Sequence, residues 1–446
     1  MSDVNNHIKP GTTLITAQPF TFLLSAENRK ERCDYCFKMY ITFAQIHPNN
    51  PNTVRFLVIQ FCKLSRCSGC QYVYYCSRNC QKLSWTIHKI ECPNIKRVHP
   101  RIVPDAARMM ARIIIKLHNG GATERGFYTP TEYRTFNDMM SHISNIKNDM
   151  EKMKHFTSLS IVLFEFLPKN VMPHPKELLE IFGRLTINSF HILDTDMTSL
   201  GVGLYLGPSI IDHSCKPNAS ATFEGTTIII KSLHNLPALD WSKIFVTYID
   251  ILRNAETRQD ELRKSYYFNC ECARCSTPEI MEIAAVCQNK NCAIPCLPTN
   301  AYCNKCGEKF PNDFKERFDI VCELSNCKLM EMAQSEGLLH PFNLLTVRML
   351  EIALAATIDI DHWEEAEIYA SQLIPPYIYY HGEVHPVTGR MYFTWGRILS
   401  LLNKKKKALE VVAKAVEIIK LTFGENHSKM TYEVKPLLSQ LITNHM

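Results

Sequence analysis

The 446-residue sequence has no apolar run approaching the roughly 20 residues that a helix needs to cross a bilayer. Residues 1–10 lack the basic start and apolar middle of a secretory signal. A strong net charge is also missing, because 50 lysines and arginines against 44 acidic residues give only +6. That balance does not by itself indicate a nucleic-acid-binding protein. We therefore expect a protein of the cytoplasm and nucleus without membrane association.

The composition excludes a disordered chain and a single-core protein. Hydrophobic residues make up 46% and charged residues 21% of the sequence, which is typical of globular proteins. The length exceeds what one hydrophobic core usually holds, so two to four structural units are predicted.

Cysteine is abundant, with 19 residues. Eight lie within residues 33–92, one is isolated at Cys215, eight fall within residues 270–306, and two follow in a predicted helix. Thiols in the cytosol and nucleus are kept reduced, so clusters with ligand-like spacing indicate metal binding rather than disulfides.

The first cluster consists of four close pairs: Cys33 and Cys36, Cys67 and Cys70, Cys76 and Cys80, and His88 and Cys92. Eight ligands fill two tetrahedral Zn²⁺ sites, and sites closed by four protein ligands are structural rather than catalytic. A domain this short needs the metal because its own core is too small to fold it. Cys62 lies outside the pattern and is expected to be a free, packed thiol.

Two further zinc sites are predicted downstream. One contains three closely spaced cysteines, Cys270, Cys272 and Cys275. Three such ligands need a fourth from elsewhere, and Cys215 is the candidate. The other has the spacing of a small zinc ribbon, Cys287, Cys292, Cys303 and Cys306. Cys296 is an alternative to Cys292, and the competing interpretation is unligated thiols in an exposed loop.

Residues 221–233 carry β-branched residues around Glu224-Gly225 and predict a hairpin. From about residue 311 the pattern becomes helix after helix, with an internal repeat at an offset of 42 residues. The repeat aligns 363–366 with 405–408 and 381–385 with 423–427. Each unit resembles a helix pair with a Gly-containing turn, so a tetratricopeptide-like (TPR-like) array is predicted.

Several motifs resemble the SET- and MYND-domain (SMYD) family of protein-lysine methyltransferases over nearly the whole chain. The finger pairs occur in MYND order, with Trp85 three residues before His88. The SET and post-SET motifs follow in family order: GVGLY at 201–205, DHSCKPN at 212–218, VTYID around Tyr248, and YYFNCECARC at 266–275.

The resemblance implies an α+β fold with a β-rich SET core split by a MYND zinc finger and a helical insertion. A post-SET zinc segment and an all-α TPR-like C-terminal lobe would follow. The implied ranges are 1–32 for the N-terminal part of the SET core, 33–92 for the finger, 93–180 for the helical insertion, 181–255 for the SET core, 256–310 for the post-SET segment and ribbon, and 311–446 for the C-terminal lobe.

The resemblance also implies how the ligands are shared. The finger pairs would interleave, so that Cys33, Cys36, Cys76 and Cys80 hold one ion and Cys67, Cys70, His88 and Cys92 the other. Cys215 would join the post-SET triplet. With the ribbon, the chain would hold four zinc ions.

The implied activity is transfer of a methyl group from S-adenosylmethionine to lysines of histones or other proteins. A free lysine, with a pKa of about 10.4, is protonated at neutral pH. An apolar aromatic channel beside a sulfonium lowers that pKa and orients the amine. The family positions of catalytic channel residues fall on Tyr248, Tyr266 and Phe190. Those of cofactor-binding residues fall on Asn188, Asp212, His213, Tyr248 and Phe268.

Three features depart from the family pattern. The family begins with a strand and a Gly-x-Gly-type turn beside the cofactor, whereas this chain starts near the following segment, residues 7–20. Asp212 stands where the family has Asn, which removes N–H donors and adds charge. Thirty residues, including the apolar run 56–61, separate Cys36 from Cys67, many more than in relatives. These departures predict an incomplete N-terminal part of the core, and a gene-model error or an inserted loop at 37–66, in a chain derived from an active enzyme.

The alternative hypothesis is a non-catalytic adaptor. In it the finger binds proline-rich peptides, the helical lobe holds a chaperone or another protein, and the SET core is a scaffold. Direct DNA binding is not expected, because the finger shows no recognition-helix pattern. We expect a monomer whose substrate site is the groove between the SET core and the C-terminal lobe.

Overall fold

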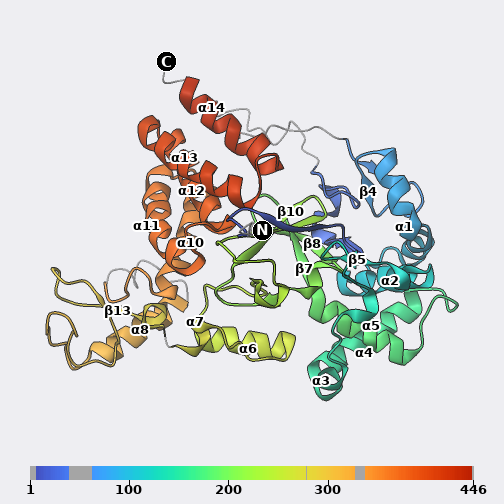
Figure 1. Cartoon of the computed structure of the whole chain (residues 1–446), viewed down its shortest axis with the longest axis horizontal. Helices are drawn as coiled ribbons and strands as arrows, with labels where there is room; N and C mark the ends of the chain where they lie inside the picture. Colours follow the sequence, from blue (N-terminus) through green and yellow to red (C-terminus); the bar gives the residue numbers. More distant parts are fainter. Residues whose placement is uncertain (1–6, 40–62, 278, 327–336, 444–446) are drawn as a thin grey trace, which may run out of the picture.

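The computed structural model describes residues 7–39, 63–277, 279–326 and 337–443. The apolar run 56–61 and Cys62 lie outside the described residues. Two three-stranded antiparallel sheets occupy the centre of the molecule (Figure 1). One has the order β2 (Thr21–Leu24), β8 (Ser199–Leu204), β7 (Ser189–Leu193), and the other the order β1 (Thr13–Ala17), β11 (Thr227–Ser232), β10 (Ala219–Glu224).

The predicted hairpin is confirmed as β10 and β11. Glu224 pairs with Thr227, and Gly225 takes a positive φ of 60°, which glycine adopts without the steric cost of a side chain. Ile228 and Ile230 on β11 are fully buried. A short parallel pair, β9 (Asp212–His213) and β12 (Phe245–Val246), lies beside this sheet.

Residues 26–188 interrupt the core between β2 and β7. They form the finger and a group of helices that flank the sheets on one side (Figure 1). The elements are η1 (Ala26–Lys30), β3 (Ser65–Arg66), β4 (Tyr74–Tyr75), α1 (Arg78–Val98), α2 (Asp105–His118), η3 (Gly121–Thr123), β5 (Gly126–Phe127), β6 (Tyr133–Arg134), η4 (Phe136–Asp138), α3 (Ile143–Asn148), α4 (Met150–Phe166) and α5 (Pro175–Asn188). The predicted α+β fold, with a β-rich core split by a finger and helices, is confirmed.

The second half of the chain passes from the core through a cysteine-rich segment to the helical lobe on the other side of the sheets (Figure 1). Its elements are η5 (Pro208–Ile210), η6 (Trp241–Lys243), α6 (Ala255–Tyr266), α7 (Ala273–Ser276), η7 (Ile280–Ile283), β13 (Ala285–Val286), β14 (Pro295–Cys296), α8 (Phe314–Asn326), α10 (Leu344–Asp359), α11 (Trp363–His381), α12 (Pro386–Leu401), α13 (Lys405–Thr422), η8 (Met430–Val434) and α14 (Lys435–Thr443).

The 42-residue repeat is confirmed in the lobe, where α11 and α13 begin at equivalent positions. Ala366 and Ala408 are both fully buried in the first turn of their helices. Gly382 and Gly424, which follow the helices, have φ angles of 100° and 110°. The repeat therefore specifies where each helix packs and where the chain turns.

Three consecutive residues, 427–429, attach the lobe to the core. Their bonds run from His427 Nε2 to the Phe223 carbonyl (2.9 Å), from the Ser428 N–H to Glu224 Oε2 (2.9 Å), and from Lys429 Nζ to Asp196 Oδ1 (2.7 Å). The acceptors lie at the tip of the β10–β11 hairpin and in the β7–β8 turn. One short segment thus joins the lobe to both sheets.

Replacing Lys429 with methionine is expected to loosen this attachment. The Lys429 side chain is fully buried, and its Nζ also donates to Glu433, so the variant loses two charge-assisted hydrogen bonds, at a cost of about 1–3 kcal/mol. Hydrogen exchange of amides 189–204, the strands on either side of the turn that contains Asp196, should become faster. Lys420→Met, which removes a surface pair with Glu425, is the control. Unchanged exchange in Lys429→Met would contradict the role of this segment.

Candidate functional site

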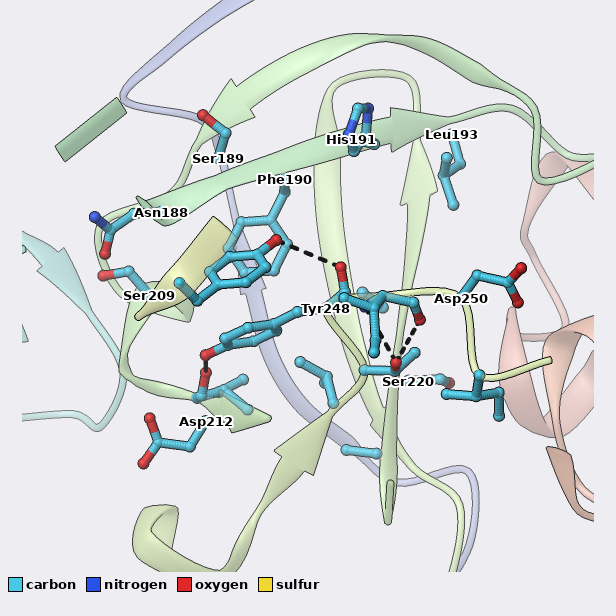
Figure 2. A pocket seen from close by; sticks show the side chains of 18 of the residues that line it. Asn188, Ser189, Phe190, His191, Leu193, Ser209, Asp212, Ser220, Tyr248 and Asp250 are labelled. Atoms are coloured by element: carbon cyan, nitrogen blue, oxygen red, sulfur yellow. Dashed lines mark hydrogen bonds between the residues drawn. The ribbon is translucent and has the colours of Figure 1, made fainter. Parts of the chain in front are cut away.

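A cavity of about 940 Å³ lies between the sheets and the C-terminal lobe. Six of the seven residues predicted for catalysis or cofactor binding line it: Asn188, Phe190, Asp212, Tyr248, Tyr266 and Phe268. Figure 2 shows Phe190 and Tyr248 in the middle of this cavity. Residues far apart in the sequence therefore meet around one space.

Three aromatic rings form one wall. The ring centroids of Tyr248 and Tyr266 are 5.1 Å apart, and those of Tyr266 and Phe268 are 6.5 Å apart. Tyr248 donates its hydroxyl hydrogen to the Ile211 carbonyl (2.5 Å), and the Tyr266 hydroxyl donates to the Tyr248 carbonyl (3.4 Å). Burial raises the pKa of both phenols. Both therefore stay neutral and act as hydrogen-bonding groups.

A cysteine cluster positions this wall. The sulfurs of Cys215, Cys270, Cys272 and Cys275 all lie within 4.8 Å of one another. A tetrahedral zinc ion with Zn–S bonds of about 2.3 Å requires sulfurs about 3.8 Å apart, so the four thiolates fit the ion. Tyr266 and Phe268 directly precede the triplet, and β9 leads into Cys215. Closing the cluster therefore brings the rings together.

His213 is the predicted cofactor-binding residue that does not line the cavity. Its side chain is buried. Its Nδ1 accepts the Tyr248 N–H (3.0 Å), and its Nε2 lies 3.3 Å from the Cys215 sulfur, where it donates. Burial lowers the pKa of His213 to about 4. The neutral imidazole links a zinc ligand to the backbone of the central tyrosine.

The finger ligands meet in two interleaved groups, each with all ligand atoms within 4.8 Å of one another. The groups are Cys33, Cys36, Cys76 and Cys80, and Cys67, Cys70, His88 and Cys92. Zinc fits both by the chemistry of the donors.

The ribbon forms a fourth group, Cys287, Cys292, Cys303 and Cys306. Cys292, rather than Cys296, completes it. The Cys296 sulfur instead lies 3.7 Å from the Ile294 carbonyl.

A buried charge network, which we did not predict, connects the finger to α2. Arg112 contacts both Glu91 Oε1 (2.9 Å) and Asp34 Oδ2 (2.6 Å), and Arg108 contacts the same two carboxylates. His88 Nδ1 donates to Glu91 Oε2 (3.3 Å). An outer carboxylate of this kind fixes the orientation and tautomer of a metal-ligating histidine.

Glu91→Gln is expected to destabilise the protein by about 3–5 kcal/mol, because two buried guanidinium groups would keep only one carboxylate. Burial alone would raise the pKa of Glu91, but Arg108 and Arg112 outweigh it and hold the pKa well below its usual range. A carboxylate with a lowered pKa stabilises the folded protein fully above the pKa that it has in the unfolded chain, about 4.3. This stabilisation is lost as the pH falls from that value through the pKa of the carboxylate in the folded protein.

Denaturation of both proteins from pH 7 to pH 3 checks this expectation. The difference in the free energy of unfolding between the wild type and Glu91→Gln should become smaller below about pH 4. Glu165→Gln, which removes an exposed partner of Arg101, should not change stability measurably. A Glu91→Gln protein as stable as the wild type at pH 7 would show that the network is dispensable.

Other polar side chains line the two ends of the cavity and were not predicted. Arg134, His142 and Ser209 join Asn188 and Asp212, and His381 and Asp250 line the same cavity. In Figure 2, Asn188, Ser209 and Asp212 lie on one side of Tyr248, and Leu193 and Asp250 on the other. Asp250 ends the VTYID motif and His381 opens the repeat at 381–385, but neither pattern indicated that the side chain would line a cavity.

The end next to the lobe contains His381, a histidine without a hydrogen-bond partner among the described residues. No hydrogen bond reaches either ring nitrogen of His381 from the described part of the chain. Its ring stacks on His385, with centroids 5.0 Å apart. Burial, with the nearby cations Arg274 and Arg390, lowers the pKa of His381 to about 3. The His381 side chain is therefore polar but uncharged at neutral pH.

Comparison with known proteins agrees with the motifs. Residues 33–92 match the MYND finger family. The chain is 27% identical to "Histone-lysine N-methyltransferase ASHR1" of Arabidopsis thaliana over 450 residues, covering 93% of this chain and 88% of that protein. It is 27% identical to "Histone-lysine N-methyltransferase SMYD3" of Mus musculus (94% and 90% covered) and 25% identical to "N-lysine methyltransferase SMYD2-A" of Danio rerio (94% and 91% covered). No helix among the described residues is long and apolar enough to span a membrane.

Proposed function

This chain belongs to the SMYD family, and we propose on that premise that it transfers methyl groups from S-adenosylmethionine to lysine side chains of proteins. The observation that carries the proposal is the aromatic wall of Tyr248, Tyr266 and Phe268, which lines a cavity with two polar ends. One end would take the cofactor and the other the substrate lysine.

The residues around the cavity would prepare the amine for attack. S-adenosylmethionine supplies an electrophilic methyl group. Tyr266 and Phe190 would surround the lysine with apolar surface, which lowers the pKa of its amine so that the neutral form enters. The Tyr266 hydroxyl, held against the Tyr248 carbonyl, would orient the nitrogen in line with the methyl group. The four-cysteine cluster keeps these groups in place and takes no part in the chemistry.

Calorimetry with S-adenosylmethionine, followed by transfer of labelled methyl groups to histones and to cytosolic proteins, tests the proposal. We expect one binding site per chain and labelling of lysine. A folded, zinc-containing chain that binds no cofactor would remove the enzyme function and leave the adaptor function. Comparing the two acceptor pools identifies the substrate class.

We also propose that the finger binds proline-rich peptides and that the protein works in the cytoplasm and nucleus. Trp85 supports the first part, because its side chain is 46% exposed beside the buried ligand His88, and an exposed tryptophan suits proline recognition. Titration with a proline-rich peptide should show saturable binding, and the Trp85→Ala variant should bind the same peptide more weakly. Imaging of a tagged full-length chain tests the location.

A further inference from the structure

Tyr267 lies between two residues of the cavity wall, but its own side chain does not line the cavity. Tyr266 and Phe268 pack beside the four-cysteine cluster, whereas Tyr267 packs against the hydrophobic core formed mainly by the finger and the helical insertion. Alternate side chains of this short segment therefore contact two different cores. The orientation of the wall depends on both of them.

The backbone of Tyr267 allows this arrangement. The residue ends α6 in the left-handed conformation, with φ 63° and ψ 32°, and its N–H donates to the Arg263 carbonyl (3.1 Å). Glycine is the usual residue at helix ends of this kind, because the Cβ of other residues is crowded in that conformation. A tyrosine keeps it only where the surrounding structure holds the residue in place. The contacts of the side chain therefore help to hold the turn.

Those contacts come from the helical insertion. The Tyr267 hydroxyl donates to Asp149 Oδ2 (3.1 Å). Burial and that carboxylate both raise the pKa of the phenol, so the hydroxyl stays protonated and remains a donor. Lys152 Nζ lies 4.9 Å from the centre of the Tyr267 ring and donates to the Ser265 carbonyl (3.2 Å). Lys152 therefore contacts both the ring and the last turn of α6, which ends at Tyr266.

Asp149 has a second role in the insertion. Its Oδ1 accepts the Lys152 N–H (3.0 Å) and so caps the first turn of α4. The ring of His142, at the start of α3, lies 5.6 Å from that of Tyr267. The junction of α3 and α4 thus contacts the end of α6 (Figure 1). Asp149 and Lys152 do not line the cavity, so any influence of theirs on it passes through α6 and Tyr267.

We propose, resting on the proposed function, that Tyr267 is a positioning residue for methyl transfer and that the insertion sets the width of the lysine channel through it. The Tyr266 hydroxyl makes a long hydrogen bond of 3.4 Å to the Tyr248 carbonyl, so the place of its ring depends on the end of α6. The contacts of Tyr267 with Asp149 and Lys152 fix that end. A fixed wall leaves little room beside the amine, which limits how many methyl groups the site admits. Tyr267 itself touches neither the cofactor nor the lysine.

Tyr267→Phe tests the contact with Asp149, because the variant keeps the ring and loses only the hydroxyl. The probe is the histone or cytosolic protein that the wild type labels, prepared with unmodified lysine and with monomethyl-lysine at the acceptor position. The ratio of kcat/KM for the two forms should change about three- to tenfold in favour of the monomethylated form. Tyr267→Asn, which suits the left-handed turn but removes the ring, should change the ratio at least as far. Equal losses on both forms would show a merely structural role and overturn the proposal.

Asp149→Ser separates the contact with Tyr267 from the cap of α4. Serine is a good helix cap, but its single, shorter oxygen does not reach the Tyr267 hydroxyl as well. The variant should change the ratio as Tyr267→Phe does. The double variant should go no further, because both substitutions remove the same hydrogen bond. Additive changes, or an unchanged ratio in Asp149→Ser, would contradict the assignment.

Tyr72→Phe is the matched control. Tyr72 packs against the same core as Tyr267 and lies under the cations of Arg29 and Arg108, but its hydroxyl has no hydrogen bond to the described residues. Its ratio should equal that of the wild type. Zinc content and melting temperature show for every variant that the fold is kept. A wild type that labels neither acceptor pool removes the proposed function, and this proposal with it, whereas an unchanged ratio in folded Tyr267 variants removes only the role of Tyr267.

Discussion

Replacing Cys215 with serine is expected to release one of four zinc ions and to abolish methyl transfer. Cys215 is completely buried, and its sulfur lies 3.5 Å from that of Cys275. Without the fourth thiolate, the triplet at 270–275 cannot complete a tetrahedron. Since zinc supplies much of the folding free energy of small cysteine-rich segments, the segment that carries Tyr266 and Phe268 should detach from the core.

Metal analysis and a methyl-transfer assay on the same preparation check this result. Zinc content should fall from four ions to three per chain, and turnover by at least about 100-fold. Cys322→Ser is the matched control, because Cys322 lies on α8, outside the four ligand groups found among the described residues. A Cys215→Ser protein with four zinc ions and normal turnover would show that the cluster does not hold the site together.

Tyr248→Phe should lower turnover about 100- to 1000-fold, a size typical of losing one oriented polar group at a reacting centre. The substitution removes the hydrogen bond to the Ile211 carbonyl, which fixes the ring beside Tyr266. The ring itself remains, so affinity for S-adenosylmethionine should stay within about twofold, a change below 0.5 kcal/mol. Loss of turnover without loss of cofactor binding is the expected signature.

Steady-state kinetics measures turnover, and calorimetry measures the affinity for the cofactor. Mass spectrometry of the product counts the methyl groups added, because a wider channel can change that number. Tyr380→Phe serves as the control. Tyr380 is also a buried tyrosine whose hydroxyl donates to a carbonyl, that of Phe342, but it does not line the cavity. Normal kinetics and product distribution in Tyr248→Phe would exclude Tyr248 from the chemistry.

Features encoded by local spacing could be predicted from the sequence. Each zinc ligand except the isolated Cys215 has another ligand only a few positions away, and the MYND and post-SET orders indicate which groups combine. The hairpin at Gly225 and the 42-residue repeat are also local patterns. Tyr248, Tyr266 and Phe268 were found because they lie within the quoted motifs, and their roles remain predictions.

Features that depend on side chains meeting across the fold could not be predicted. Asp34, Glu91 and Arg112 come from a turn and two different helices and show no common spacing, so their buried network becomes visible only when α2 packs on the finger. Arg134 lies in a two-residue strand whose neighbours carry no motif. The choice between Cys292 and Cys296 was likewise decided by the course of the backbone.

The pairing of β1 with β11 and of β2 with β8 has a consequence for synthesis of the chain. Thr21 pairs with Leu204, and Ile15 pairs with Ile230. Neither β1 nor β2 can therefore pair with its partner strand until roughly two hundred further residues have been synthesised. The finger and the helices of the insertion can fold during that wait, because their contacts are largely among themselves. The rate of folding should therefore depend on the supply of zinc. A finger without its ions stays unfolded between β2 and β7, and it would delay the pairing of the strands on either side of it.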